Sequence, residues 1–164
     1  RQIHRRRDSR HHRDALSVDH PVIRGEGNFH VPGSEADLVG RGLACRIEPE
    51  GKARVVLRKS SNPKLLKALA DGARLAVTFT QPSTHRSIQL KAPAARIVDA
   101  NVGDAPAAIA QTTAFSRDLM DVGYSESFAK TYCGFEPHDL VTLTFLPENA
   151  FVQTPGPNAG SALQ

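Results

Sequence analysis

The sequence has few cysteines and no long apolar run. Its two cysteines, Cys45 and Cys133, lie far apart and form no Cys-x-x-Cys pair, which argues against a disulfide scaffold and a thiolate zinc site. We expect both to be reduced thiols of the core. No stretch approaches the roughly 20 apolar residues of a membrane span, and the N-terminus lacks the apolar core of a signal peptide. We therefore expect a cytoplasmic protein without a membrane segment. Because the chain begins at Arg1 and its one methionine is Met120, we do not expect Arg1 to be the translational start.

The excess of positive charge is confined to the first residues of the chain. The sequence carries 21 Lys and Arg against 17 Asp and Glu, a net charge of +4. Residues 1–14 hold six arginines and two aspartates, which accounts for the whole excess, and the rest is neutral. A basic arm can bind nucleic acid or acidic lipid, but a solvated tail has the same composition. We expect no nucleic-acid partner for the neutral body.

The length of 164 residues predicts one domain, and 40% hydrophobic with 23% charged residues is an ordinary globular composition. Residues 1–34 show no sustained period of 2 or 3.6 and contain several prolines and glycines. We interpret them as a basic, poorly patterned arm, with at most a short strand at 21–24. Residues 35–164 are predicted to form the folded domain.

Short runs in which apolar and polar residues alternate are typical of half-buried strands. Two such runs, at 43–47 and 55–58, flank Glu50-Gly51 and predict a hairpin. Further strands are predicted at 75–80, at 84–98 after a turn at 81–83, and at 140–146, followed by an irregular tail from residue 153.

Helix signals occur at three places. The sequence Ser61-Asn62-Pro63 supplies a cap and a proline suited to the first turn, before a leucine stripe that ends at Gly72. A second helix is predicted from a capping Asp104, with a buried side of Ile109, Phe115, Leu119 and Met120, and a third from Ser125 to about Gly134.

Sequential hairpins with few helices predict a mainly β fold. We expect an antiparallel sheet, closed or nearly closed into a small barrel with peripheral helices. A doubly wound parallel sheet would need a regular alternation of strands and helices, which the sequence lacks.

The start of the first predicted helix has the composition of a phosphate seat. A helix N-terminus offers N–H groups and a partial positive charge, and here Ser60, Ser61 and Lys64 would surround it. A capped, solvated surface helix would carry the same residues, so both interpretations stay open.

The predicted strand after residue 84 has a polar face. A period of 2 places His85, Ser87 and Gln89 on one side, where they could contact the polar edge of a ligand such as a flavin ring. Arg86 lies near the strand end, from which a long side chain can reach a phosphate. A solvent-facing strand and a surface ion pair are the alternatives.

No catalytic or metal-binding motif is recognisable. The pair Gly25-x-Gly27 lacks the third glycine of a dinucleotide fingerprint, and the histidines near the N-terminus lie among arginines that would repel a metal ion. Ser87 and His85 have no aspartate at a spacing diagnostic of a hydrolase triad. We therefore predict no metal site and name no catalytic residue.

The segment from Pro82 to Lys91, Pro-Ser-Thr-His-Arg-Ser-Ile-Gln-Leu-Lys, resembles the pyridoxamine 5′-phosphate oxidase-like family of FMN-binding split barrels. Residues 41–45, 74–80 and 153–160 fit the same branch of small bacterial proteins, so the resemblance covers about residues 38–160. The family usually has a helix and a first core strand before the position of Arg41, and residues 1–34 show the pattern of neither.

The resemblance implies a split β-barrel homodimer with FMN in the groove between subunits. By similarity, Ser60, Ser61 and Lys64 would bind the phosphate, while Arg86, Ser87 and Gln89 would contact the flavin, with His85 as a further binding residue. The leading hypothesis is an FMN-dependent oxidoreductase in which the flavin carries the hydride or electron chemistry. A non-catalytic flavin- or haem-binding module is the alternative, and a nucleic-acid-associated protein acting through the basic arm is a third hypothesis.

Overall fold

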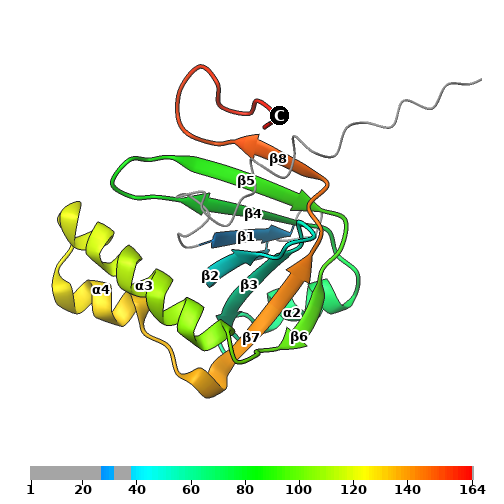
Figure 1. Cartoon of the computed structure of the whole chain (residues 1–164), viewed down its shortest axis with the longest axis horizontal. Helices are drawn as coiled ribbons and strands as arrows, with labels where there is room; N and C mark the ends of the chain where they lie inside the picture. Colours follow the sequence, from blue (N-terminus) through cyan, green and yellow to red (C-terminus); the bar gives the residue numbers. More distant parts are fainter. Residues whose placement is uncertain (1–26, 32–37, 164) are drawn as a thin grey trace, which may run out of the picture.

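All paired strands of the structure are antiparallel (Figure 1). The computed structural model describes residues 27–31 and 38–163. The strands are β1 (Gly27–Val31), β2 (Leu38–Ile47), β3 (Ala53–Arg58), β4 (Leu75–Thr80), β5 (Ser87–Ala92), β6 (Arg96–Asp99), β7 (Leu140–Phe145) and β8 (Asn149–Val152). The helices are α2 (Pro63–Ala70), α3 (Asp104–Asp121), α4 (Glu126–Cys133) and the 3-10 turn η1 (Pro137–Asp139).

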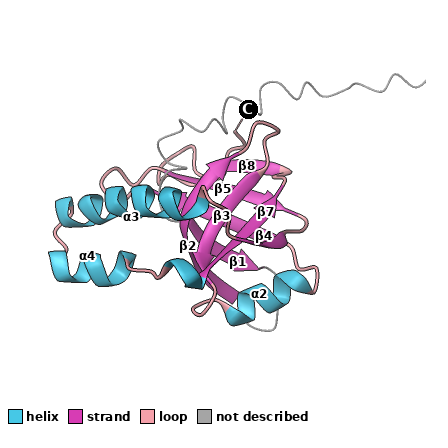
Figure 2. Cartoon of the chain, turned by 60° about the horizontal axis from the view of Figure 1, so that its bottom comes forward, coloured by secondary structure: helices cyan, strands magenta, loops and turns pink. Residues whose placement is uncertain are grey.

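The strand order is β6-β7-β3-β2-β1-β4-β5-β8. Among the described residues no pairing joins the terminal strands β6 and β8, so the curved sheet forms a split barrel. Figure 2 shows the helices on the outside of the strands, with α3 and α4 together and α2 apart from them. The predicted mainly β, antiparallel split barrel with peripheral helices is confirmed. No helix in the described part of the chain is both long enough and apolar enough to span a membrane.

The predicted hairpin of β2 and β3 is present and positions the core. Gly51 has a φ of 78°, the left-handed conformation that glycine accepts without a Cβ clash, and closes the turn by donating to the Glu48 carbonyl at 2.8 Å. Both faces of β3 are buried: Val55 lies in the barrel interior, and Val56 packs in the cluster beneath α3. This double burial explains why β3 is apolar along most of its length.

The prediction of one long strand at 84–98 is wrong, because a turn precedes Ser87 and a second interruption separates β5 from β6. Residues 81–86 form a turn in which the Gln81 amide donates to the Arg86 carbonyl at 2.9 Å, so β5 begins only at Ser87. Pro93, which has no N–H to donate to a sheet, follows the end of β5. The chain then crosses the barrel, and β6 pairs with β7 rather than with the partners of β5.

Two short strands, β1 and β8, were not predicted. β1 lies in the segment predicted to be an arm, yet it pairs with β2 on one side and β4 on the other, so the predicted lack of structure up to residue 34 is wrong at 27–31. β8 pairs with β5. β8, Asn-Ala-Phe-Val, does not alternate, and the short alternating run 28–31 of β1 lies among the glycines and prolines that favoured an arm. The strand suggested at 21–24 lies outside the described residues.

The helices begin where predicted, but α3 buries a different side. Ser125 caps α4 by accepting from the Phe128 amide at 3.2 Å. In α3, Ile109 is 56% exposed and Met120 is 38% exposed, contrary to prediction. The buried residues of α3 are Asp104, Ala108, Thr112 and Leu119, with Phe115 half-buried. Small residues at 108 and 112 let the helix lie close to β2, which sets the helix rotation.

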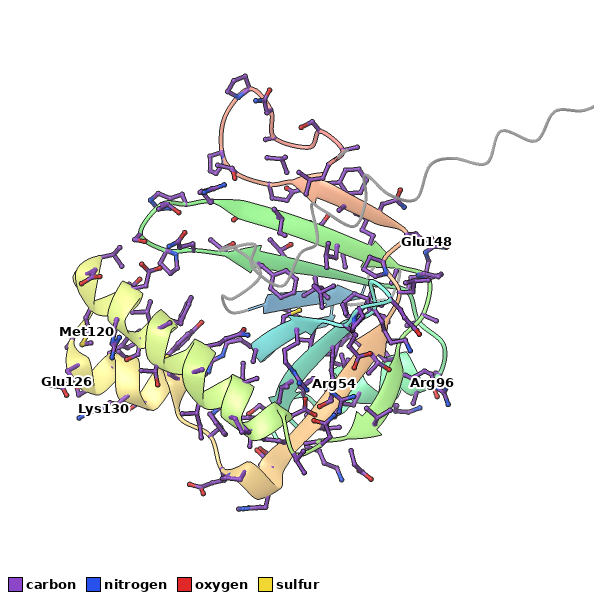
Figure 3. The ribbon with its side chains drawn as sticks, in the orientation of Figure 1. Arg54, Arg96, Met120, Glu126, Lys130 and Glu148 are labelled. Atoms are coloured by element: carbon purple, nitrogen blue, oxygen red, sulfur yellow. The ribbon has the colours of Figure 1, made fainter. Side chains whose placement is uncertain are left out.

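Asp104 is not a helix cap but the centre of a buried charge cluster. It is the first residue of α3, and its carboxylate accepts from Arg54 Nη2 at 2.6 Å, from the Thr142 hydroxyl at 2.9 Å and from the Asn101 amide at 2.8 Å. Arg46 also donates to it. In Figure 3, Arg54 extends from β3 into the space between the strands and the start of α3. Residues from three strands and one helix therefore converge on one carboxylate.

Candidate functional site

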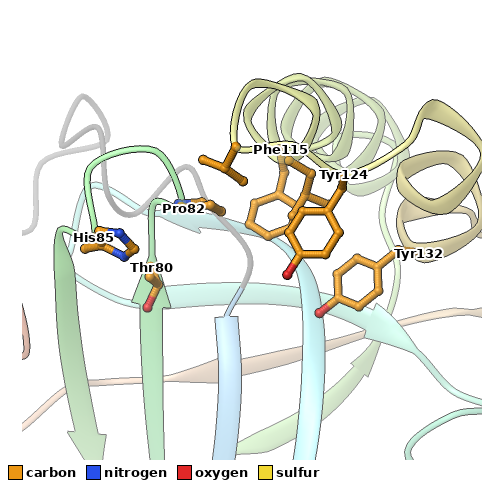
Figure 4. Close-up of a pocket in the computed structure, with 8 residues that line it drawn as sticks. Thr80, Pro82, His85, Phe115, Tyr124 and Tyr132 are labelled. Atoms are coloured by element: carbon orange, nitrogen blue, oxygen red, sulfur yellow. The ribbon is translucent and has the colours of Figure 1, made fainter.

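A pocket of about 590 Å³ lies between the β4–β5 turn and the helices α3 and α4 (Figure 4). We call it the aromatic pocket; it is lined by Thr80, Pro82 and His85 from the sheet side and by Phe115, Leu119, Val122, Tyr124 and Tyr132 from the helix side. Its volume is within the range of small-molecule sites, and its wall combines apolar side chains with hydroxyl and imidazole groups.

The helix side of the aromatic pocket follows from a four-residue spacing in the sequence. Tyr124, Phe128 and Tyr132 lie on one face of α4 and its preceding turn, and their rings stack with centroid separations of 4.8 and 5.5 Å. Phe115 of α3 extends the stack to Tyr132 at 6.3 Å. Figure 4 shows the hydroxyls of Tyr124 and Tyr132 directed toward the sheet. The pocket wall therefore combines ring faces with two phenolic hydroxyls.

His85 reaches the sheet side of the pocket from a constrained turn. Its φ of 55° is in the left-handed region, which histidine occupies more often than most residues. The turn is held by the Ser83 amide, which donates to Asp118 of α3 at 3.2 Å, and by the Thr84 hydroxyl, which donates to Gln81 at 3.0 Å. Figure 4 shows the imidazole beside Thr80. The backbone geometry thus fixes where an exposed imidazole enters the pocket.

A second, smaller pocket of about 250 Å³ lies at the start of α2. We call it the basic pocket; it is lined by Val39, Gly40, Arg41, Arg58, Ser61 and Asn62. A Cβ on Gly40 would lie 2.4 Å from Leu65 Cδ2, so only glycine lets α2 approach β2 this closely. Asn62 joins the same elements, since its side chain donates to the Arg58 carbonyl at 2.7 Å and accepts from the Arg41 amide at 3.3 Å.

The two pockets meet at Arg41 and Tyr132. The guanidinium carbon of Arg41 lies 3.7 Å from the centroid of the Tyr132 ring, and the same guanidinium donates to the Tyr132 carbonyl. Arg58 donates to the Gly134 carbonyl at 3.1 Å, just after α4. Both arginines of the basic pocket are therefore oriented by the end of α4, and Arg41 contacts the aromatic pocket through Tyr132.

The predicted phosphate seat is only partly formed as expected. Ser61 lines the basic pocket, whereas Lys64 is exposed and lines neither pocket. Ser60 gives its donors to Asp139: its amide donates at 2.8 Å and its hydroxyl at 2.5 Å. The pKa of Asp139 is lowered, chiefly by the hydrogen bond from the Ser60 hydroxyl and further by the nearby charges of His138 and Arg58.

The predicted polar strand face divides into different roles. Ser87 is buried; its hydroxyl lies 2.6 Å from that of Thr80, and its amide donates to the Thr154 hydroxyl at 2.9 Å. Gln89 donates to Thr78 at 3.1 Å. Both residues join strands, while Arg86 is exposed in the turn and His85 lines the aromatic pocket.

The two predicted groups fall in different pockets of the described chain, with His85 in the aromatic pocket and Ser61 in the basic pocket. The turn before β5 lies near α3, whereas α2 packs against β6 and β2 on another part of the barrel (Figure 1). No hydrogen bond or ion pair between described residues joins them. Sequence reasoning did not assign Arg41, Arg58, Tyr124 or Tyr132 to a site, although the spacing of the α4 aromatics was a usable signal. Within the described ranges, no group of three or more metal-ligating side chains is placed to hold an ion.

Solved structures provide neighbours for this fold. The chain matches no known family profile and no curated protein in sequence. Several of its structural neighbours are described as putative pyridoxamine 5′-phosphate oxidases or as members of the pyridoxinephosphate oxidase family. This is the family that the sequence motifs resemble.

Three neighbours illustrate the match. HupZ of Group A Streptococcus is 11% identical with a TM-score of 0.48, covering 85% of this chain and 93% of its own. General stress protein 26 of Bacillus anthracis str. Sterne is 12% identical with a TM-score of 0.46, covering 80% and 87%. A Clostridium acetobutylicum protein of the pyridoxinephosphate oxidase family, related to general stress protein 26, is 11% identical with a TM-score of 0.43, covering 79% and 80%. At these values the neighbours' ligands do not transfer to this chain.

Proposed function

We propose that this chain binds FMN, with the flavin ring in the aromatic pocket and the phosphate toward the basic pocket. The observation that supports this proposal is the contact between Arg41 and Tyr132, which makes a ring-lined pocket and a guanidinium-lined pocket neighbours. A ligand that carries both a planar ring system and an anion is complementary to this pair of pockets.

The residues of the aromatic pocket fit a flavin ring. A volume of about 590 Å³ is within the range of ordinary ligand pockets, and the rings of Phe115, Tyr124 and Tyr132 offer stacking surfaces. The Thr80 hydroxyl and the His85 imidazole supply hydrogen-bonding groups for the polar edge of the ring. In this arrangement Ser87 and Gln89 act indirectly, by joining β5 to its neighbours.

The residues of the basic pocket fit a phosphate. Guanidinium groups match phosphate oxygens in geometry and charge, and Arg41 and Arg58 line the pocket together with the Ser61 hydroxyl. Lys64, exposed on the first turn of α2, adds a further cation nearby. Arg86 is on the other side of the site and is not needed for the phosphate in this proposal.

The proposed activity is that of a flavin-dependent oxidoreductase. A bound flavin supplies hydride or electron transfer, and the protein binds and orients it. In this chain the aromatic stack would exclude water from the ring, and His85 would hold a proton at an imidazole nitrogen beside it. A homodimer, which the sequence resemblance implies, is part of the same proposal and predicts a dimer mass in light scattering.

A haem-binding module is the second candidate, because one observation favours it. Haem iron takes histidine as an axial ligand, and His85 presents an exposed imidazole at the edge of an aromatic pocket. The two candidates differ in spectrum: haem gives an intense Soret band that flavin lacks. Loss of that band in His85→Ala would favour axial ligation.

The deciding experiment is titration of the purified protein with FMN, riboflavin and haemin, followed by absorption and fluorescence. We expect FMN to be bound with quenched fluorescence, and Tyr132→Leu to weaken binding about fivefold, since stacked aromatic pairs contribute about 1 kcal/mol beyond burial. Phe128→Leu is the matched control, because Phe128 belongs to the stack but does not line the pocket. A protein that binds none of the three ligands would contradict both candidates. Reduction of bound flavin by a nicotinamide cofactor would then identify an enzyme.

A further inference from the structure

The corner between β3 and α2 is clamped by a single aspartate. The Lys59 amide donates to the Asp139 backbone carbonyl at 2.7 Å. The Ser60 amide donates to one carboxylate oxygen of Asp139 at 2.8 Å, and the Ser60 hydroxyl donates to the other at 2.5 Å. Asp139 therefore accepts both donors that Ser60 offers, through two oxygens, as a phosphate group would.

The charge of this carboxylate acts on the basic pocket. Ser60 is adjacent to Ser61, and Arg58 pairs across the sheet with Leu140, the residue after Asp139. Arg58 is close enough to lower the pKa of Asp139, after the larger effect of the Ser60 hydroxyl. The carboxylate is thus ionised at neutral pH, and its charge interacts with one of the two arginines that line the basic pocket.

We propose that Asp139 is a specificity-determining residue, whose carboxylate takes the donors of Ser60 and disfavours a second anion in the basic pocket. This inference takes the identity of the whole ligand, FMN, from the proposed function. The effect of Asp139 on an anion in the basic pocket does not depend on that identity. The proposal predicts a smaller difference between the affinities for FMN and riboflavin than two phosphate-binding arginines alone would produce. A phosphate can accept hydrogen bonds from the Ser60 amide and hydroxyl only when the Asp139 carboxylate no longer accepts them.

Two substitutions of Asp139 separate its charge from its role as a clamp. Asp139→Asn removes the charge and keeps an oxygen for the Ser60 amide, so the corner keeps a hydrogen bond. Asp139→Ala removes the charge and releases both Ser60 donors. Glu136→Gln is the matched control, because it makes the same charge change three residues earlier, at an exposed side chain. Thermal unfolding of each variant checks that it folds.

The primary probe is inorganic phosphate, measured by calorimetry at constant ionic strength, with FMN and riboflavin in parallel titrations. We expect Asp139→Asn to bind phosphate and FMN about tenfold more tightly than the wild type, because removing a like charge next to the Ser60–Ser61 turn removes a repulsion of about this size at a surface site. Asp139→Ala should match or exceed it. Riboflavin affinity should stay unchanged, and Glu136→Gln should gain less than about twofold, since exposed charges are screened.

A further variant tests the proposal from the side of the donor. Because Ser60 already donates to Asp139, Ser60→Ala should leave FMN affinity unchanged. A fivefold or greater loss in Ser60→Ala would show that Ser60 binds the phosphate directly and would overturn the proposal. The proposal is also overturned if the Asp139 variants bind phosphate no more tightly than the wild type. It is equally overturned if Glu136→Gln raises the phosphate affinity as much as the Asp139 variants do.

The outcomes keep this inference distinct from the proposed function. If no variant binds either flavin but the Asp139 variants bind phosphate more tightly, the FMN proposal fails and the role of Asp139 stands. If every protein binds both flavins and phosphate affinity does not respond to Asp139, the flavin proposal stands and Asp139 is only a clamp of the β3–α2 corner.

Discussion

The guanidinium of Arg41 lies against the ring of Tyr132, with 3.7 Å between its central carbon and the ring centroid. The same guanidinium donates to the backbone carbonyl of Tyr132, so ring and carbonyl hold it from one residue. Stacking on an aromatic face while donating in the plane is a property of arginine that lysine lacks. The pair therefore fixes a cation where the aromatic and basic pockets meet.

Arg41→Lys is expected to weaken FMN binding about tenfold while leaving the fold intact. The ammonium keeps the charge but loses the stacked, forked geometry. Riboflavin affinity should fall by less, because only FMN carries the phosphate. Fluorescence titrations of both ligands measure the two effects.

The control for this prediction is Arg74→Lys. Arg74 is largely exposed and lines neither pocket, and its Nη2 atom lies 3.6 Å from Oε2 of Glu148. Its substitution should change neither affinity. Equal losses of FMN and riboflavin in Arg41→Lys would mean that Arg41 supports the ring pocket and not the phosphate.

Substitutions at His85 are expected to separate backbone strain from ligand binding. At a φ of 55°, asparagine and glycine are tolerated, whereas a β-branched residue should cost about 1–2 kcal/mol of stability. His85→Asn and His85→Gly should therefore unfold like the wild type, and His85→Val at lower denaturant concentration. All three remove the imidazole and should weaken ligand binding alike. If His85→Asn binds as the wild type does, the imidazole does not contact the ligand.

Local chemistry allowed the sequence to predict the parts of the fold that depend on neighbouring residues. The Glu50-Gly51 turn, the proline start of α2 and the Ser125 cap of α4 each depend on residues within a few positions. The motif from Pro82 to Lys91 added the split-barrel class. β1 and β8 are short and are stabilised by the strands beside them, so their own residues carry little signal.

The candidate site was harder to predict because its decisive contacts are distant in sequence. Ser60 and Asp139 are 79 positions apart, so the donors that indicated a phosphate seat gave no sign that a carboxylate already takes them. Arg41 and Tyr132 are 91 positions apart. Asp104 was interpreted as a cap because its partner Arg54, 50 positions away, could not be known. Of the predicted binding residues, only His85 and Ser61 line the pockets, and His85 does so from a turn and not from the predicted strand.

Asp104→Asn is expected to lower the free energy of unfolding by about 3–5 kcal/mol, the usual cost of removing one partner from a buried ion pair. The Asp104 side chain is fully buried and the Arg54 side chain is 9% exposed. Water therefore cannot solvate the guanidinium that loses its counter-charge. Asp121→Asn, at the exposed end of α3, should change stability by less than about 0.5 kcal/mol. Urea unfolding of the three proteins gives these differences. A small loss in Asp104→Asn would mean that the cluster relaxes or admits water.

The Asp104 carboxylate should make the free energy of unfolding depend on pH. Burial alone would raise the pKa of Asp104, but hydrogen bonds from Arg54, the Asn101 amide, Thr142 and Arg46 hold that pKa well below its usual range. A lowered pKa in the folded state means that the contribution is present above the unfolded-state pKa, about 3.9, and is lost as the pH falls below it. The stability difference between wild type and Asp104→Asn should therefore shrink as the pH falls from 5 to 2. A constant difference would contradict the assigned role.

Cys45 should react with a thiol reagent only when the barrel itself opens. Its side chain is buried in the same core cluster as Val55, its cross-strand partner, and burial raises the pKa of its thiol, which removes the reactive thiolate. Gln111 of α3 bonds to the backbone of this residue, since its side chain accepts from the Cys45 amide at 2.9 Å and donates to the Cys45 carbonyl at 2.7 Å. In a Cys133→Ser variant, labelling of Cys45 at pH 8 should be slow in buffer and complete within minutes in denaturant. A Gln111→Ala substitution should speed labelling only as far as it lowers global stability, because detaching α3 does not uncover the barrel interior. Labelling that speeds up more than global unfolding does would mean that β2 opens locally together with α3.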